Sequence, residues 1–193
     1  MKLRKRLIAL TMAAACAATA FAGAAYTDQS SIKVDSKVID TLTEKNVIKG
    51  FEDGSFQPDK LVSRAEMAKM IFVLRTNSDD AVYYANWMNS PLTDINDSWA
   101  KGYIKYCQHY GIVCGRSDSK YYPNAPVTTV EAAKMLLLHL RYTEFLFTGE
   151  DWKAVAMARS DEIGLLQSVE SGMDEPLTRQ YAAQMIYNAS NID

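Results

Sequence analysis

The chain has 193 residues, of which 48% are hydrophobic and 23% are charged, and its formal net charge at pH 7 is −2. This length suits one domain or an array of small units, and the composition is that of an ordinary globular protein. The charge balance, with no basic tract, argues against a nucleic-acid-binding protein.

The first 25 residues have the pattern of a secretory signal peptide. A basic start is followed by an apolar, alanine-rich run over 7–21 and by small residues near 22–25. The run is about 15 residues, shorter than the roughly 20 that a membrane-spanning helix needs, so cleavage is favoured over anchoring. Cys16 leaves lipidation open as an alternative. Cleavage removes four positive charges, which leaves 17 Lys and Arg against 23 Asp and Glu and a net charge near −6.

Two cysteines remain after cleavage, Cys107 and Cys114. An exported chain can pair them, but two cysteines are too few for a disulfide framework, and they form no C-x-x-C motif. Cys107 replaces a leucine of the first repeat described below, so we expect it in the core, with Cys114 more exposed. A disulfide between them stays open as an alternative.

An internal repeat with an offset of 65 residues organises the rest of the chain. Residues 34–75 align with 99–140 without a gap, and the loop landmarks and a helix start coincide. A third, weaker copy follows, in which Leu177-Thr178-Arg179 corresponds to Val62-Ser63-Arg64. The predicted segments are a signal peptide (1–25), a first repeat (26–75), a linker (76–91), a second repeat (92–141) and a degenerate third repeat (142–193).

Each copy contains two predicted helices. The second helix begins with a capping box, Ser63 with Glu66, and the second copy repeats it with Thr128 and Glu131. In the third copy the glutamate is replaced by Tyr181, so that capping box is half lost. One such unit cannot bury enough apolar surface to be stable alone, so we expect the three second helices to share a core.

Arg64 is the first candidate for a binding residue. It occupies the first position of the second helix, where the helix dipole disfavours a cation. Free N–H groups at a helix start bind anions, and an arginine beside them adds a planar fork suited to carboxylate or phosphate. The alternatives are a solvated surface arginine or one paired with a nearby acid. Arg179 holds the same position in the third copy, whereas the second copy has Thr129.

For the other candidates we favour structural explanations. Glu66 fits the capping box, and Asp53 with Gly54 fits a tight turn. Trp99 and Trp152 fit either a core role or an aromatic wall on which a sugar stacks. We find no H-E-x-x-H motif, nucleophile elbow or phosphate loop, so neither enzyme activity nor a cofactor is predicted.

The residues that carry these patterns resemble the S-layer homology domain family. The resemblance rests on the loop Gly50–Pro58, on Val62–Ala68 as the counterpart of the family's T-R-A-E motif, and on Thr93-Asp94 with Trp99-Ala100. It implies a mainly α fold in which three helix-loop-helix repeats form a pseudo-trimeric, three-pronged module around a central helical bundle. Grooves would lie between neighbouring prongs.

Members of this family anchor exported proteins to the bacterial cell wall by binding secondary cell wall polymers, often through a pyruvylated, anionic sugar. The resemblance implies that Arg64 and Arg179 grip the acidic group. The other implied groove residues are Trp99, Trp152, Gly50, Asp53, Asp94 and Glu66. Departures from the family pattern are Thr129 in place of the motif arginine, Val34 in place of the tryptophan, and the missing Asp-Gly loop of the third copy. We therefore expect one or two working grooves.

The sequence predicts a secreted, monomeric, non-catalytic module at the bacterial cell wall. Its predicted partner is an anionic wall polysaccharide, with other surface proteins as further partners through the Tyr83–Trp87 stretch, and with neither nucleic acid nor membrane after signal cleavage. The alternative is a structural or protein-interaction module that keeps the fold but has lost sugar binding.

Overall fold

The computed structural model describes residues 26–192, so the predicted signal peptide lies outside the described residues. Within this part the fold is mainly α, as predicted, and has no strand beyond three isolated bridges. The α-helices are α1 (Ser36–Glu44), α2 (Arg64–Thr76), α3 (Val82–Trp87), α4 (Lys101–His109), α5 (Thr129–His139), α6 (Trp152–Glu162) and α7 (Arg179–Ala189). Two 3₁₀ turns, η1 (Gln29–Ser31) and η2 (Glu144–Phe147), complete the elements.

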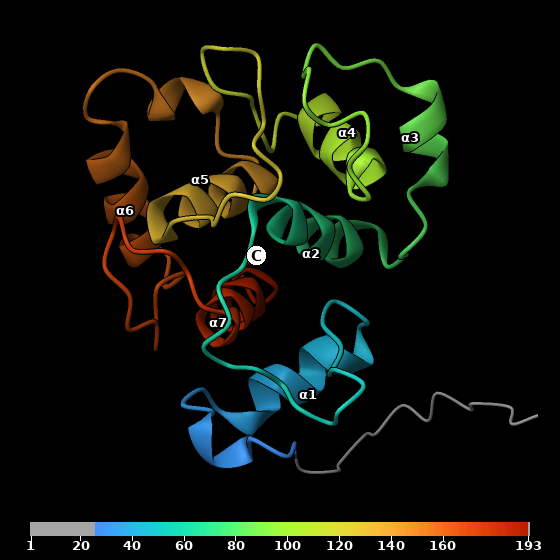
Figure 1. Cartoon of the computed structure of the whole chain (residues 1–193). Helices are drawn as coiled ribbons and strands as arrows, with labels where there is room; N and C mark the ends of the chain where they lie inside the picture. Colours follow the sequence, from blue (N-terminus) through green and yellow to red (C-terminus); the bar gives the residue numbers. More distant parts are fainter. Residues whose placement is uncertain (1–25, 193) are drawn as a thin grey trace, which may run out of the picture.

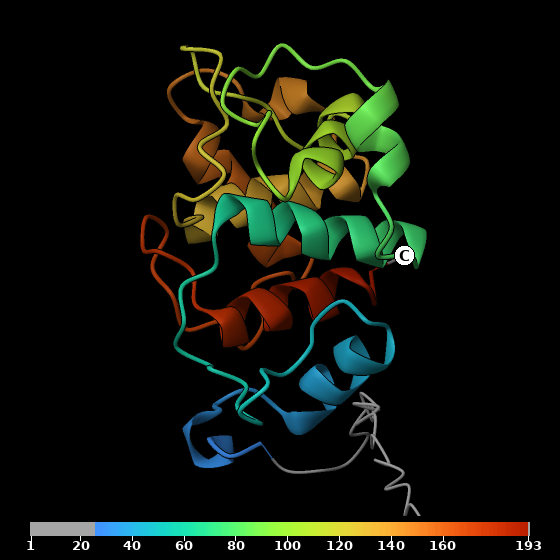
Figure 2. The ribbon, with the colours of Figure 1, turned by 45° about the vertical axis from the view of Figure 1, so that its right-hand side comes forward.

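Three inner helices, α2, α5 and α7, contact one another at the centre of the molecule (Figure 1). These are the second helices of the three copies, so the shared core follows the prediction. Each outer helix packs on an inner helix of a different copy: α4 on α2, α6 on α5, and α1 on α7. The view in Figure 2 shows α2 and α7 side by side, with α1 beneath α7. The copies are therefore interlocked in a closed cycle.

A ring of three backbone hydrogen bonds closes this cycle at the entrance to the inner helices. The Val62 N–H donates to Leu177 O (3.0 Å), the Leu177 N–H to Val127 O (2.9 Å), and the Val127 N–H to Val62 O (2.9 Å). All three residues are buried. Because each copy gives one donor and one acceptor, the ring ties the first copy to the third as directly as to the second.

The start of each inner helix lies against the loop of the next copy. The Arg64 N–H donates to Ala125 O and the Ala65 N–H to Pro123 O, both at 2.9 Å. The equivalent bonds are Thr129 N to Glu175 O (3.0 Å), Val130 N to Met173 O (3.0 Å), Arg179 N to Lys60 O (2.8 Å) and Gln180 N to Pro58 O (3.1 Å). The expectation that these helix starts offer free N–H groups to an anion was therefore wrong, because neighbouring carbonyls satisfy them.

The predicted capping boxes are present in the first two copies. Ser63 Oγ accepts from the Glu66 N–H at 3.1 Å, and the Glu66 carboxylate accepts from the Ser63 N–H at 2.8 Å. The same reciprocal pair joins Thr128 and Glu131. In the third copy Thr178 makes no side-chain cap and its Oγ1 is buried without a partner, which agrees with the half-lost box.

The predicted linker is more ordered than its composition indicated. It contains α3, which packs on α4. Tyr84 makes edge contacts with Phe72 of α2 and Tyr106 of α4, with ring centroids 5.7 and 4.9 Å apart. Tyr83 and Trp87, which were also expected to pack, are exposed instead. The two cysteines are free, with Cys107 buried and Cys114 exposed, as the repeat alignment indicated.

Partly buried His139 at the end of α5 predicts a specific acid sensitivity. Burial and the neighbouring Arg75 cation lower the pKa of His139 from 6.5 to about 4, and its Nδ1 has no hydrogen-bond partner. The unfolded chain therefore takes up this proton first, so the stabilisation is present above pH 6.5 and is lost as the pH falls toward 4. Between pH 7 and pH 5 we expect a loss of about 1 to 2 kcal/mol, allowing for partial exposure.

This loss is measured as the free energy of unfolding in urea at both pH values. His139→Gln removes the titrating group, so its loss between pH 7 and pH 5 should be smaller than that of the wild type by this amount. His109→Gln, on the exposed end of α4, is the matched control. Equal pH dependence of wild type and His139→Gln would contradict the assignment.

Candidate functional site

The start of each inner helix meets the next copy at one of three equivalent junctions, where the resemblance implied grooves. We name each by the residue at the first position of its inner helix: the Arg64 groove, the Arg179 groove and the Thr129 groove. The Arg64 groove faces the second copy, the Arg179 groove faces the first, and the Thr129 groove faces the third. They differ in charge and in what already occupies them.

The Arg64 groove contains a pocket of about 130 Å³. Its walls come from all three copies: Arg64 from α2, the loop from Ile112 to Arg116, the face of α5 that carries Glu131 and Lys134, and Trp152 from α6. A ligand in this pocket would therefore contact residues of all three copies.

Arg64 is held firmly at the back of this pocket. The residue is only 7% exposed, and its guanidinium lies 4.6 Å from the ring centroid of Tyr121. The Nε atom donates to Tyr121 O at 2.8 Å, and Nη1 lies 3.1 Å from Glu131 Oε1. Of the three readings of Arg64 that the sequence left open, the structure excludes a solvated surface arginine and shows a buried one paired with an acid of the next copy.

Two further cations surround this pair. Arg116 Nη2 lies 3.5 Å from the same Glu131 oxygen, and Lys134 Nζ lies 5.3 Å from the Trp152 ring centroid. Three cations and one carboxylate, Glu131, therefore line the pocket of a chain whose overall charge is negative. Lys134 also lies 4.0 Å from the carboxylate of Glu144, which is outside this pocket. The pocket can accept at least one further negative charge.

Arg179 is buried in its own groove to a similar extent, at 8% exposure. Its Nε donates to Phe56 O at 3.0 Å and its Nη2 to Lys49 O at 2.5 Å. The guanidinium lies 5.1 and 4.9 Å from the ring centroids of Phe51 and Phe56. Burial lowers the pKa of Arg179, although the charge of Glu66 opposes this shift.

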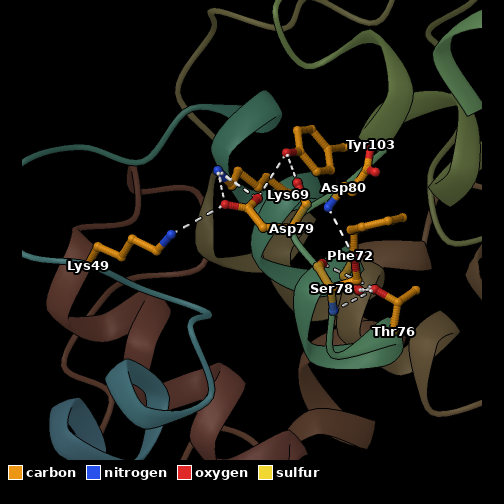
Figure 3. Close-up of polar contacts among 8 residues, drawn as sticks. All are labelled: Lys49, Lys69, Phe72, Thr76, Ser78, Asp79, Asp80 and Tyr103. Carbon is orange, nitrogen blue, oxygen red and sulfur yellow. Dashed lines mark hydrogen bonds and ion pairs between the residues drawn. The ribbon is translucent and has the colours of Figure 1, made fainter. Parts of the chain in front are cut away.

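Next to Arg179, which bonds to the Lys49 carbonyl, the side chains of Lys49 and Lys69 share a carboxylate of the chain itself, Asp79 (Figure 3). Asp79 lies 2.9 Å from Lys69 Nζ and 3.4 Å from Lys49 Nζ, and the Tyr103 hydroxyl donates to it at 2.9 Å. Burial opposes ionisation of Asp79, but the hydrogen bonds from Lys69 and Tyr103 outweigh it and lower its pKa. The two lysines of this groove therefore already have an anionic partner.

The Thr129 groove has no arginine at its helix start. Thr129 is fully buried, and its hydroxyl lies 2.7 Å from Ser171 Oγ. On the facing helix, Tyr181 stands where the other copies have glutamate, and its hydroxyl donates to Glu170 at 3.1 Å. Nothing in this arrangement selects an anion.

A protein-family model, the S-layer homology domain, matches residues 25–68 and 91–133. Two segments of the chain are therefore similar to S-layer homology repeats. These matches lie in the first two copies and do not extend to the third.

Several similar proteins are named as surface layer or anchoring proteins. The chain is 27% identical over 200 residues to a surface layer protein of Brevibacillus choshinensis, covering 99% of this chain and 17% of that protein. It is 28% identical over 95 residues to a cellulosome-anchoring protein of Acetivibrio thermocellus, covering 49% and 21%. It is 29% identical over 141 residues to the S-layer protein sap of Bacillus anthracis, covering 69% and 16%. The chain thus spans about a fifth or less of these relatives.

Several predicted groove residues of the S-layer homology repeats have structural tasks. Both Asp94 oxygens accept backbone N–H groups, from Tyr121 at 2.8 Å and Tyr122 at 2.7 Å. The Asp53 side chain accepts from the Ser55 N–H at 2.9 Å, which forms an Asx turn. Glu66 completes its capping box. These three carboxylates shape the loops that carry the grooves.

Of the remaining predicted residues, one lines a pocket. Trp152 lines the pocket of the Arg64 groove, whereas Trp99 is 58% exposed and stands beside Tyr103, with ring centroids 6.1 Å apart. Gly50 follows Lys49, and a Cβ there would lie 2.9 Å from the Tyr26 ring, so only glycine allows this close packing.

Sequence reasoning missed the cations that accompany the arginines. Lys69 and Lys134 are identical across the first two S-layer homology repeats, and this identity was the available signal. Arg116 aligns with Phe51, and Asp79 lies beyond the aligned residues 34–75, so the repeat comparison did not single them out. Within residues 26–192, no group of three or more His, Cys, Asp or Glu side chains is placed to hold a metal ion.

Proposed function

We propose that this chain is a non-catalytic cell-wall anchoring module that binds an anionic secondary cell wall polysaccharide, with the Arg64 groove as its binding site. The supporting observation is that three cations but only one carboxylate, Glu131, line this pocket beside the Trp152 ring. The surface location and anchoring role named for the relatives agree with this proposal. No helix within residues 26–192 has both the length and the apolar character to cross a bilayer.

The binding model assigns each residue a task. The acidic substituent of a sugar, such as a pyruvyl carboxylate, pairs with Arg116 and Lys134 and replaces the long bond, 3.5 Å, that Arg64 Nη2 donates to Cys114 O. The apolar face of the sugar ring stacks on Trp152. Because the Tyr121 carbonyl and ring already fix Arg64, little side-chain entropy is lost on binding.

The proposal is tested by co-sedimentation of the purified chain with wall polysaccharide from the organism that produces it. We expect the wild type to sediment with the native polymer and not with polymer whose acidic substituents have been removed. Lys134→Ala and Trp152→Ala should each weaken binding by about tenfold, whereas Lys153→Ala, beside Trp152 but paired with Asp174, should not. Equal sedimentation with native and acid-stripped polymer would overturn the proposal.

A related prediction concerns the Arg179 groove. Asp79→Asn removes the carboxylate that neutralises Lys49 and Lys69 but keeps a hydrogen-bond acceptor for Tyr103. We expect a second site to become available, so that the binding stoichiometry measured by calorimetry rises from one toward two per chain. The apparent affinity should rise by about three- to tenfold, which corresponds to roughly 1 kcal/mol.

The adjacent Asp80 provides the control for this variant. Asp80 accepts from the Val82 N–H and touches neither lysine, so Asp80→Asn should leave the stoichiometry unchanged. An unchanged stoichiometry in Asp79→Asn would show that the two lysines do not form a binding site.

A protein-interaction module is the second candidate. It is favoured by α3, on which Val82, Tyr83 and Trp87 are all exposed. This candidate predicts that wild type and Arg64→Ala sediment equally poorly with the polymer, and that Trp87→Ala alters binding of a protein partner instead.

A further inference from the structure

A larger pocket of about 370 Å³ adjoins the Arg64 groove at the far end of the inner helices. Its walls are the ends of α2 and α4 and the turn that follows α5. The lining side chains that matter for recognition are Arg75, Tyr110, Arg141, Tyr142 and Glu144. None of these residues belongs to the site proposed above.

The two pockets form one continuous surface. Leu138 lines both of them, and the neighbouring residues Gly111 and Ile112 each line one. Glu131, Lys134, Leu138 and Arg141 are spaced by three, four and three residues, so they follow one face of α5 into the turn beyond it. From Glu131 to Arg141 this face extends roughly 15 Å, which is longer than one monosaccharide.

Arg141 holds a backbone conformation that costs free energy. Its φ is +72°, and it follows α5 at the position where a helix commonly ends in glycine. The Arg141 N–H donates to Leu138 O at 3.1 Å and the Tyr142 N–H to Leu137 O at 3.0 Å, the hydrogen-bond pair of that glycine motif. A side chain here is unfavourable by about 1 kcal/mol relative to glycine, so helix termination alone does not explain the arginine.

The pocket has the chemistry of an acidic carbohydrate site. Arg75 is fixed in place, because its guanidinium lies 5.0 Å from the Tyr110 ring centroid and donates to His139 O at 3.4 Å. Two guanidinium groups and one carboxylate, Glu144, line the pocket, and Glu144 also lies 4.0 Å from Lys134 of the Arg64 pocket. The phenols of Tyr110 and Tyr142 supply aromatic faces and hydroxyl groups. The volume lies within the usual range for ligand sites, roughly 300 to 1,000 Å³, whereas the Arg64 pocket is smaller.

We propose that this pocket is a second subsite, in which the sugar residues next to the anchored acidic residue bind, with Arg141 contacting their charged or hydroxyl groups. The inference rests on the proposed function, since it extends the same ligand along the same face of α5. In this model the Arg64 pocket binds one acidic sugar, and the larger pocket binds the sugars that follow it in the polysaccharide. Affinity should therefore depend on the length of the polysaccharide fragment.

The test is calorimetry of the purified chain with fragments of the wall polysaccharide, separated into single repeat units and fragments of three or more. For the wild type we expect the longer fragments to bind at least tenfold more tightly. Arg141→Gly removes the guanidinium and also the unfavourable free energy of a side chain at positive φ. It should therefore abolish this length advantage, while single units bind as before. Its melting temperature should be equal to or above that of the wild type, which separates a binding defect from misfolding.

Arg159→Ala, an exposed arginine of α6 paired with Glu162, is the matched control and should keep the length advantage. If Arg141→Gly retains the length advantage, or if the wild type has none, the second subsite is overturned while the proposed function stands. If the wild type binds no fragment of any length, the proposed function fails and this inference fails with it.

Discussion

Arg64→Ala is expected to reduce the affinity for wall polysaccharide by about 100-fold or more, roughly 3 kcal/mol of binding free energy. The substitution removes the preorganised fork at the back of the pocket and frees Glu131 to pair with Arg116 and Lys134, which lowers the positive charge that the ligand meets. It should also cost about 2 to 3 kcal/mol of folding free energy, because a half-buried carboxylate loses its main partner. Calorimetry measures the first effect and urea unfolding the second.

Arg179→Ala distinguishes the loss of binding affinity from the loss of folding stability. Arg179 has the same position and nearly the same burial in the third copy, and it too donates to two backbone carbonyls. We expect a comparable loss of stability but a loss of affinity below about threefold, because Asp79 neutralises the lysines of its groove. If Arg179→Ala impairs binding as strongly as Arg64→Ala, the assignment of the working groove is wrong.

Phe72→Ala is expected to lower the free energy of unfolding by about 3 to 5 kcal/mol. Phe72 is 1% exposed and makes edge contacts with the rings of Tyr84, Tyr103 and Tyr106, at centroid distances of 5.7, 5.1 and 4.8 Å. Truncation opens a cavity at the point where α2, α3 and α4 meet. Urea unfolding measures the cost, and limited proteolysis of residues 76–91 shows whether α3 detaches.

Tyr83→Ala is the control for this prediction. Tyr83 is 64% exposed beside Tyr84, so its removal should change the free energy of unfolding by less than about 1 kcal/mol. A cost below about 1.5 kcal/mol for Phe72→Ala would mean that the aromatic cluster can repack.

The elements of the fold were largely predictable because their signals are local. Ser63 and Glu66 lie three residues apart, and the capping box that they form depends on that spacing alone. The repeat then carried the same prediction to Thr128 and Glu131. The apolar face of each second helix correctly indicated a shared core.

The grooves were less predictable because they form between copies. Aligning the repeats identifies Arg64 and Arg179 as equivalent, but it does not reveal that Arg64 meets Glu131 and Tyr121 of the following copy. The occupied N–H groups at the helix starts escaped prediction for the same reason, since their acceptors lie in another copy. Asp79 lies beyond the aligned residues 34–75, and only the three-dimensional arrangement places it between Lys49 and Lys69. At the same offset of 65 residues, Glu144 lies 4.0 Å from Lys134, the equivalent of Lys69.

The interlocked cycle also gives a common explanation for two departures from the family pattern that lie far apart in the sequence. The second copy has lost its arginine at Thr129, and the third has lost its glutamate at Tyr181. Arg64 pairs across copies with Glu131, so the missing arginine and the missing glutamate are the two halves of one ion pair, at one junction. Losing both halves leaves no unpaired charge in the interior, whereas losing either alone would be costly. These two substitutions therefore affect only the junction between the second and third copies. The other two junctions keep their arginines.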